Sequence, residues 1–462
     1  MLVATWIITF TLIIGVGIYA GTKITSANQW SGGDKTMGAF AIGAVLGAWQ
    51  IGGMSIVGAA QNGYTMGIAG CWYSIAGGLY FLLVGVLSKV LRQNMVSEAL
   101  PDFLARRYST PLARIQSYIW VVFGCIYIPI QLKTIASIIQ IVIPGFNSAA
   151  AMVCGVTIAA VYTGFAGMKG SSAIGRIVCI STYVLLIIFV VKNLAGFGGY
   201  AGLIAQLPKD YDKLIVPAMP KQQIFAWAVG GALSSAVMQS VLQPVLAAKD
   251  AKAGRNGCII GYIFAAPICI LTAMIGMMGR AANDGLGDGA TAFAWTIKEF
   301  SSPLYAGVIF AVCTMIIAAT MATMMMATGT ILTNIYKNQI NTKASDKQIL
   351  NVSRWGTIIL AFFTLIPGFL IPSAQLTDLF LTLTYSVTAP FSFCVIIGIL
   401  WKKVNSKAAT ASAAVGIIVA ITWVILGLNA KLNIVYPVII ASYTVGIIVT
   451  LLTSKEDAVK TQ

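Results

Sequence analysis

The chain has 462 residues, of which 58% are hydrophobic and only 9% are charged, and its formal net charge is +16. This balance excludes a soluble globular domain, whose surface needs many more charged side chains, and favours a protein embedded in a bilayer. The chain contains no histidine, which excludes histidine-based proton relays and most zinc or general-base chemistry.

Long apolar runs predict an all-α integral membrane protein. A bilayer core about 30 Å thick needs roughly 20 apolar residues per helix, and on that measure the chain has about thirteen spans. The predicted spans are, in chain order, 3–22, 38–62, 66–91, 113–144, 147–165, 171–195, 222–243, 257–280, 303–335, 351–372, 375–400, 407–428 and 432–453. The first is interpreted as a retained helix, because no basic residue precedes it and its apolar stretch is too long for a signal peptide.

Basic residues predict the orientation. They cluster in the loops around 89–114, 249–255, 337–354 and 402–407. These loops all lie on the cytoplasmic side if the N-terminus is outside, as the positive-inside rule requires. We therefore expect a multi-pass protein of a prokaryotic plasma membrane with its C-terminus in the cytoplasm. The positive charge suits anionic lipid and is not the footprint of a nucleic-acid-binding protein.

A short motif occurs twice. Residues 49–53 (WQIGG) precede Gln61, and residues 227–231 (WAVGG) precede Gln239 at the same spacing. The copies open the second and the seventh predicted span, so they run in opposite directions. Secondary transporters often contain such inverted repeats, whose glycine-interrupted helices unwind at the midplane to bind substrate and ions. Alternatively, each glycine pair only permits close helix packing.

This repeat predicts the domain organisation. We expect one transmembrane domain over residues 1–462, with an extra N-terminal helix and loop at 1–37. The first repeat would cover 38–195 and the second 222–400, and two C-terminal helices would follow at 407–453. All eight cysteines lie in apolar runs without a Cys-x-x-Cys spacing and are interpreted as buried hydrophobic residues.

Four segments resemble the solute:sodium symporter family: 48–67 (AWQIGGMSIVGAAQNGYTMG), 162–170 (YTGFAGMKG), 239–257 (QSVLQPVLAAKDAKAGRNG) and 333–354. The similarity runs nearly end to end, and the AAKD segment is its most specific part. The resemblance implies a five-plus-five inverted-repeat core of the leucine-transporter type, with one helix before it and two after. It also implies sodium-driven uptake of sugars, amino acids, vitamins or small organic acids.

Two departures from the family affect its sodium site. Where the resemblance places two adjacent hydroxyl residues that help to bind sodium, the chain has Ala318 and Ala319. Where it places a Thr-Asp pair, the chain has Ile174 and Gly175. Sodium is a hard cation that prefers oxygen ligands, so these positions offer little beyond backbone carbonyls. Elsewhere, Gln243-Pro244 replaces the family's Gln-Arg pair.

Two interpretations of Arg176 stay open. In the first, its permanent cation takes the place of the missing sodium and ties neighbouring spans together. In the second, Arg176 lies one turn inside the membrane and reaches back to the cytoplasmic interface, as long basic side chains do. Thr320, beside the alanine pair, offers a hydroxyl that would rescue a distorted ion site. The ion-site region is predicted to comprise Gly52, Met315, Ala318, Ala319, Thr320, Gly175 and Arg176, without a firm metal ligand set.

The repeat and the resemblance together predict a solute site. Its residues are Trp49, Gln50, Gly52, Gly53, Ser55, Gln131, Gly230, Gly231, Ser234 and Ser235. The two serines replace a Tyr-Trp gate of sugar-transporting relatives, which argues against a sugar; the alternative for them is close helix packing. Lys133 is more often a snorkelling lysine than a ligand. Asp378, the only acid in a predicted span, is interpreted as part of a helix cap. A cavity with cations and almost no anions suits a small anionic solute.

We therefore predict a secondary active transporter of a small polar or anionic organic solute, working by alternating access, with altered or lost sodium coupling. The alternatives are an ordinary sodium:solute symporter and a membrane sensor with a transporter fold, which would carry a soluble output domain. An enzyme is not expected, because the sequence has no phosphate-binding loop or paired carboxylates. We expect no cofactor; the candidate coupling ions are sodium and a proton. The expected partners are the solute and membrane lipid, and a monomer is compatible with the sequence.

The orientation can be tested by cysteine labelling. With Lys213→Cys or Lys347→Cys, a membrane-impermeant thiol reagent added outside should label the first variant and not the second, relative to the parent chain. The opposite pattern would reverse the topology.

Overall fold

The computed structural model describes residues 1–22, 24–32, 34–95, 99–287, 289–372, 384 and 388–459. Within these ranges the chain is almost wholly helical, and its β-type pairing consists of two isolated bridges. Asp378 and the first part of the predicted span 375–400 lie outside the described residues. The helices of the N-terminal half are α1 (Leu2–Gly21), α2 (Ala27–Ser31), α3 (Ala39–Gln50), α4 (Ala59–Met66), α5 (Trp72–Gly78), α6 (Tyr80–Asn94), α7 (Leu100–Arg107), α8 (Thr110–Val142), α9 (Ser148–Gly196) and α10 (Gly199–Ala205).

The C-terminal half is also built from helices. Its helices are α11 (Lys221–Ser235), α12 (Gln239–Leu246), α13 (Ala251–Ala265), α14 (Ile268–Ala282), α15 (Ala292–Glu299), α16 (Pro303–Ile335), α17 (Asp346–Asn351), α18 (Thr357–Phe363), α19 (Leu365–Leu370), α21 (Gly398–Leu400), α22 (Ser406–Ile425) and α23 (Val435–Val459). Among the described residues, nine helical stretches are long and apolar enough to cross a bilayer, or ten if the bent pair α11–α12 forms one span. The all-α membrane fold is therefore confirmed, whereas the number thirteen stays a prediction.

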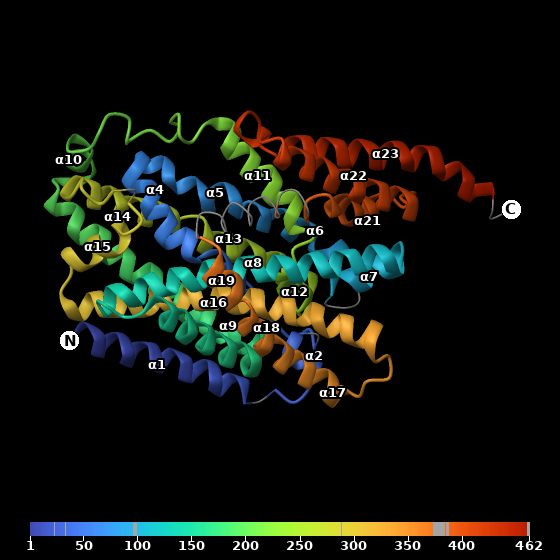
Figure 1. Ribbon diagram of the computed structural model, residues 1–462, viewed down its shortest axis with the longest axis horizontal. Helices are drawn as coiled ribbons and strands as arrows, with labels where there is room; N and C mark the ends of the chain where they lie inside the picture. Colours follow the sequence, from blue (N-terminus) through green and yellow to red (C-terminus); the bar gives the residue numbers. More distant parts are fainter. Residues whose placement is uncertain are drawn as a thin grey trace.

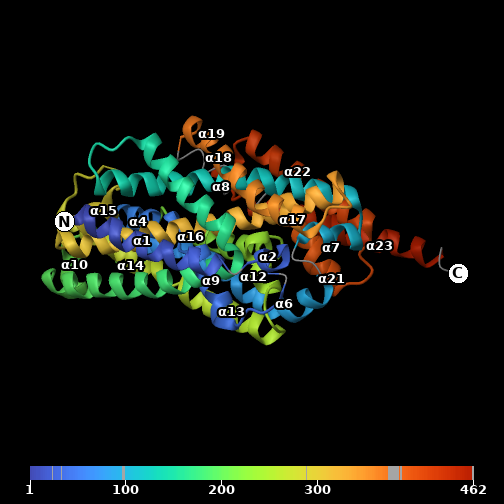
Figure 2. The ribbon, with the colours of Figure 1, turned by 90° about the horizontal axis from the view of Figure 1, so that it is seen from below.

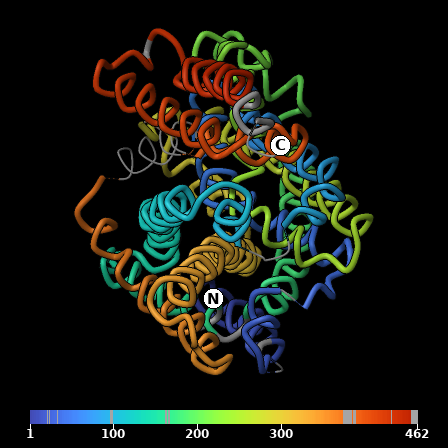
Figure 3. The backbone as a smooth tube through the Cα atoms, turned by 90° about the vertical axis from the view of Figure 1, so that its right-hand side faces the viewer, coloured from blue at the N-terminus to red at the C-terminus, as the bar shows by residue number. Residues whose placement is uncertain are grey.

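Helix α16 is the centre of the bundle. In its most apolar stretch 94% of the residues are buried inside the protein, against 22% for α1. Helix α1 runs alongside α9 and α16, as Figures 1 and 2 show. Helices α22 and α23 pair with each other at the opposite edge of the bundle (Figure 3). The two termini lie at opposite ends of the molecule (Figure 1).

Helix α9 joins two of the predicted spans through a kink. Gly167 has φ 50° and ψ −154°, in a region that favours glycine. A Cβ atom at Gly167 would lie 2.7 Å from the carbonyl oxygen of Trp30. The fully buried Trp30 side chain also donates from Nε1 to the carbonyl oxygen of Gly164, at 2.9 Å. The short helix α2 therefore fits into the kink because position 167 has no side chain.

Gln243, which precedes the proline that departs from the family pattern, ties three elements together. Its Nε2 atom donates to the carbonyl oxygen of Ser31 at 2.9 Å and to Oγ1 of Thr330 at 3.0 Å. Helix α12 is thereby fixed to α2 and α16. All three side chains are buried, so the contacts satisfy polar groups that water does not reach.

Helices α3 and α13 pack closely through glycine. A Cβ atom at Gly257 of α13 would lie 2.7 Å from Cβ of Ile42 on α3, and one at Gly43 would lie 2.4 Å from Cγ2 of Ile260. Small residues allow such close approach of helices in membranes.

Gly257→Ala is therefore expected to lower the stability of the protein by about 1–3 kcal/mol through overpacking. The matched control is Gly15→Ala on α1, where a Cβ atom meets nothing within 4 Å. The apparent melting temperature, followed by tryptophan fluorescence, measures both. Equal melting temperatures for the two variants would contradict the packing at Gly257.

Candidate solute and ion sites

The interruption predicted at the first glycine pair is present. Helix α3 ends at Gln50, Ile51 has φ −82° and ψ 61°, and a π-helical turn (Met54–Gly58) then leads into α4. A Cβ atom at Gly52 would lie 2.9 Å from Cγ2 of Thr320 on α16, and one at Gly53 would lie 2.5 Å from Oγ1 of Thr134 on α8. The glycine pair therefore lets α8 and α16 approach the broken backbone from two sides.

Side chains satisfy the backbone groups that the break exposes. The amide of Gly53 donates to Oε1 of Gln131 at 2.9 Å. The Ser55 hydroxyl donates to the carbonyl oxygen of Gln50 at 2.6 Å. Oγ1 of Thr320 lies 2.6 Å from the carbonyl oxygen of Ala48, to which it donates. Unpaired backbone groups are costly in a membrane, so these three contacts stabilise the break.

The interruption predicted at the second glycine pair is wrong. Helix α11 runs unbroken through Gly230 and Gly231, and the chain changes direction by 53° only between Ser235 and Gln239. A Cβ atom at Gly231 would lie 3.3 Å from the carbonyl oxygen of Gly77. This pair therefore allows α11 to pack against α5, which is the alternative that the sequence left open.

A cavity lies between the α3 break, α5, α6, α8 and α11. It contains roughly 630 Å³ of space not filled by atoms, including the part open to solvent. Its described lining residues are Trp49, Gln50, Gly52, Met54, Tyr73, Gly77, Tyr80, Tyr127, Gln131, Trp227, Gly231, Ser234, Met238 and Thr384. A concave lining of aromatic residues with a few polar groups is typical of small-molecule sites.

The cavity brings together only part of the predicted solute site. Of the predicted residues, the lining includes Trp49, Gln50, Gly52, Gln131, Gly231 and Ser234 and leaves out Gly53, Ser55, Gly230 and Ser235. The Ser55 hydroxyl lies 2.9 Å from that of Ser74 in a buried cluster. The Ser235 hydroxyl donates to the carbonyl oxygen of Ala232 on its own helix.

Sequence reasoning missed most of the aromatic lining. The Tyr127 and Trp49 ring centroids lie 5.0 Å apart, and those of Tyr73 and Trp227 lie 6.0 Å apart with an interplanar angle of 86°. Tyr127 precedes Gln131 by four residues and therefore shares its helix face, a signal that the sequence offered. Tyr73 carried no such signal, because its place depends on the packing of α5 against α11.

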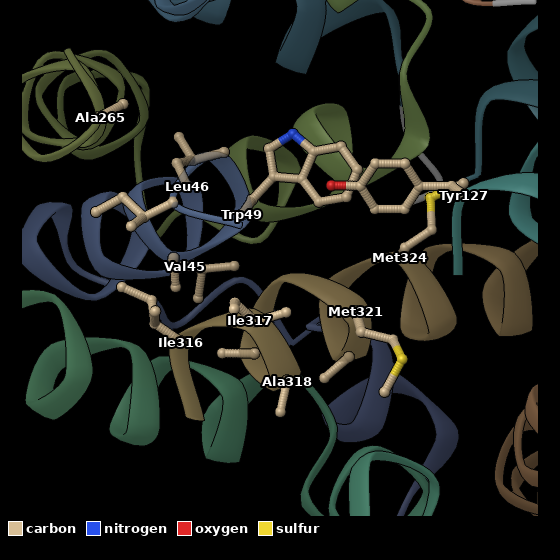
Figure 4. Close-up of a cluster of buried hydrophobic side chains, with 14 of the residues drawn as sticks. Val45, Leu46, Trp49, Tyr127, Ala265, Ile316, Ile317, Ala318, Met321 and Met324 are labelled. Atoms are coloured by element: carbon tan, nitrogen blue, oxygen red, sulfur yellow. The ribbon is translucent and has the colours of Figure 1, made fainter. Parts of the chain in front are cut away.

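In the predicted ion-site region, protein groups occupy the space between α3 and α16. Ala318, Ala319 and Met315 are buried and offer no side-chain oxygen. Figure 4 shows Val45 of α3 beside aliphatic side chains of α16. The hydroxyl of Thr320, which follows the alanine pair in the sequence, lies 2.6 Å from the carbonyl oxygen of Ala48 and 3.0 Å from that of Ile316.

Arg176 does not lie in this region, so the hypothesis that it replaces sodium is wrong. Gly175 faces α3, because a Cβ atom there would lie 2.7 Å from the carbonyl oxygen of Ala44. Successive residues of an α-helix point about 100° apart. Arg176 is accordingly exposed, and its Nε atom donates to the carbonyl oxygen of Ser172 on its own helix, at 3.3 Å. The second interpretation, an outward-reaching arginine, fits this position.

Lys133 also points away from the cavity. Its Nζ atom donates to the carbonyl oxygen of Ile371 at 2.5 Å, at the end of α19. Lysine often satisfies the last carbonyls of a helix in this way. Neither Lys133 nor Arg176 is among the described lining residues, so the cations behind the prediction of an anionic solute lie elsewhere.

Replacing Gln131 tests the contact that holds the break. Gln131→Leu leaves the buried Gly53 amide without its acceptor, which should cost about 1–3 kcal/mol of stability. Faster hydrogen exchange at residues 51–58 and a lower melting temperature should follow. Gln140→Leu on the exposed end of α8 is the control. Unchanged exchange in Gln131→Leu would show that the contact does not hold the break.

Comparisons with curated proteins give distant but long matches. The sodium/glucose cotransporter of Vibrio parahaemolyticus is 22% identical over 440 residues, covering 86% of this chain and 80% of its own length. The sodium/pantothenate symporter of Escherichia coli K12 is 24% identical over 449 residues, covering 92% of this chain and 89% of its own length. The osmoregulated proline transporter OpuE of Bacillus subtilis is 21% identical over 472 residues, covering 96% of this chain and 94% of its own length.

Solved structures share the fold. A substrate-bound, outward-open Na⁺-coupled sialic acid symporter matches with a TM-score of 0.81 at 16% identity, covering 98% of this chain and 97% of its own. Mhp1, a nucleobase-cation-symport-1 family transporter, matches with a TM-score of 0.63 at 13% identity, covering 91% and 94%. At these identities the matches support the fold alone.

The family assignment rests on the length of the match. The profile of the Sodium:solute symporter family matches residues 31–416, which include both the α3 break and α16. The expected five-plus-five transporter fold and the resemblance noted in the sequence are thereby confirmed, and the chain belongs to the sodium:solute symporter family.

Proposed function

We propose that this family member carries a small, polar, net-neutral organic solute by alternating access and does not use the family's sodium site. The single observation that carries the proposal is the contact between the Thr320 hydroxyl and the carbonyl of Ala48, beside Ala318 and Ala319. We also propose that residues 38–195 and 222–400 form the two repeats, flanked by 1–37 and 407–453.

The solute site is the cavity beside the α3 break. In transporters of this kind, an interrupted helix at the midplane supplies backbone groups to the substrate. Gln50, Gln131 and Ser234 contribute polar groups from α3, α8 and α11 to one cavity. No charged side chain is among its described lining residues, and burying an uncompensated charge is costly. A net-neutral solute therefore suits the cavity better than the anionic solute expected from sequence.

The loss of sodium binding follows from ligand chemistry. A sodium ion needs several oxygen ligands, and the side chains of the two alanines supply none. The Ala48 carbonyl, freed at the end of α3, accepts a hydrogen bond from Thr320 instead. To bind the Ala48 carbonyl, sodium would have to displace the Thr320 hydroxyl. It would not gain the two hydroxyl ligands that the family has at the positions of Ala318 and Ala319. The names of the relatives favour the alternative, ordinary sodium symport, which the following experiment distinguishes.

Sodium binding can be measured on the purified protein in lipid nanodiscs. We expect no saturable binding of ²²Na⁺ and no gain in melting temperature when sodium replaces potassium at constant ionic strength. A ligand that binds only the folded state raises its stability by about 2.7 kcal/mol at a concentration 100 times its Kd. A saturable, sodium-specific gain in the unmodified chain would restore ordinary sodium symport.

A gain-of-function variant tests the mechanism. Ala318→Ser and Ala319→Ser combined with Thr320→Val supply two hydroxyls and release the Ala48 carbonyl, so sodium binding should appear. The same serines with Thr323→Val form the control, because the Thr323 hydroxyl donates to the Ala319 carbonyl within α16. Gly175→Asp is omitted, since its Cβ atom would meet the Ala44 carbonyl. Sodium binding in the control alone would contradict the role given to Thr320.

A further inference from the structure

The lining of the cavity also limits the chemistry of the solute. We infer that the solute is a zwitterion with an N-methylated ammonium group and a carboxylate, that is, a betaine. This inference rests on the proposed function, because it takes the cavity beside the α3 break as the solute site. Three properties of the lining carry it: aromatic walls, occupied hydrogen-bond acceptors and available donors.

Aromatic rings form several walls of the cavity. Five of its described lining residues are aromatic, namely Trp49, Tyr73, Tyr80, Tyr127 and Trp227. The rings of Tyr73 and Trp227 stand at 86° to each other, so they form a corner and not a parallel slot. Rings set at such an angle can contact a compact methylated cation from two sides. Aromatic cages recognise quaternary ammonium ligands through the negative faces of the rings.

Three carbonyl oxygens of the lining residues each already accept a hydrogen bond from the protein. Oε1 of Gln50 accepts from the Tyr80 hydroxyl, and Oε1 of Gln131 accepts from the Gly53 amide. The carbonyl oxygen of Thr384 accepts from Ser234 at 3.1 Å. A primary ammonium has three N–H donors that need acceptors. An ammonium whose hydrogens are replaced by methyl groups needs none, so this lining favours the methylated form.

Donors remain available at the break. The amide nitrogen of Gln50, a side chain only 8% exposed, has no hydrogen-bond partner among the described residues. The backbone N–H of Gly52 likewise has no partner in the described part of the chain. Both residues line the cavity, where the π-helical turn and α4 begin. The N-terminal end of a helix carries partial positive charge and attracts anionic groups. A carboxylate is the group that suits these donors.

The overall charge of the lining requires the two groups to occur together. A cation alone would lack a carboxylate partner among the described lining residues, and an anion alone would lack a basic one. A zwitterion carries its own counter-charge. Its carboxylate faces the amide donors of Gln50 and Gly52, while its methyl groups contact Trp49, Tyr73 and Trp227.

Binding of trimethylammonioacetate to the purified protein in nanodiscs tests the inference by calorimetry. Two matched ligands isolate each group: 3,3-dimethylbutanoate has carbon in place of the cationic nitrogen, and glycine has a primary ammonium. We expect both to bind at least tenfold more weakly than trimethylammonioacetate. Choline, which lacks the carboxylate, should also bind at least tenfold more weakly. Equal binding of 3,3-dimethylbutanoate would overturn the role of the ammonium.

Substitutions in the lining test which residues contact the ammonium group of the ligand and which contact its carboxylate. Trp227→Leu should weaken binding of trimethylammonioacetate at least tenfold, and Trp227→Phe should restore most of it by keeping an aromatic face. Gln50→Leu should reduce the preference for trimethylammonioacetate over choline, because it removes a carboxylate donor. Trp355→Leu, an exposed residue of another region, is the control and should bind normally. Normal binding by Trp227→Leu would contradict the aromatic wall.

The outcomes separate this inference from the proposed function. If trimethylammonioacetate does not bind but proline, glucose or pantothenate binds and Gly231→Leu abolishes that binding, the betaine inference fails and the solute cavity stands. If trimethylammonioacetate binds and the Trp227, Gln50 and Gly231 variants all bind it unchanged, both the inference and the cavity assignment fail.

Discussion

The break in α3 is the constraint on which the rest of the structure depends. A helix interrupted inside a membrane leaves backbone groups that water cannot satisfy, and each must find a partner in the protein or a ligand. Gln131, Ser55 and Thr320 supply these partners from α8, from the break itself and from α16. The central helix α16 and the long helix α8 are therefore held against the same few residues, which couples the packing of the bundle to the geometry of its site.

The two sides of the break differ in what they leave for a ligand. On the α16 side, the Ala48 carbonyl is taken by Thr320, and alanine and aliphatic side chains fill the surroundings (Figure 4). Towards α5, α8 and α11, the amide of Gln50 and the backbone of Gly52 border a cavity with aromatic walls. A ligand can shift an alternating-access equilibrium only through its different affinity for the two states. In this protein we assign that role to the solute and not to a sodium ion at the family's site.

The sequence predicted much of the fold and less of the site. Apolar length located the membrane helices, and the Gly52-Gly53 pair located the first break, because both depend on local composition. The second break could not be placed from Gly230 and Gly231, since their role is set by the approach of α5. Arg176 had two interpretations because sequence does not say which face of α9 meets α3. The position of Tyr73 in the cavity likewise depends on a contact between helices that lie far apart in the chain.

The most direct test of this account is a structure determined by electron cryomicroscopy in a sodium-containing buffer. We predict that the Thr320 hydroxyl stays within hydrogen-bonding distance of the Ala48 carbonyl, with no ion between α3 and α16. Density for an ion coordinated by the Ala48 carbonyl, with the Thr320 hydroxyl turned to bind it, would contradict the account and establish a sodium site built from threonine and backbone oxygens.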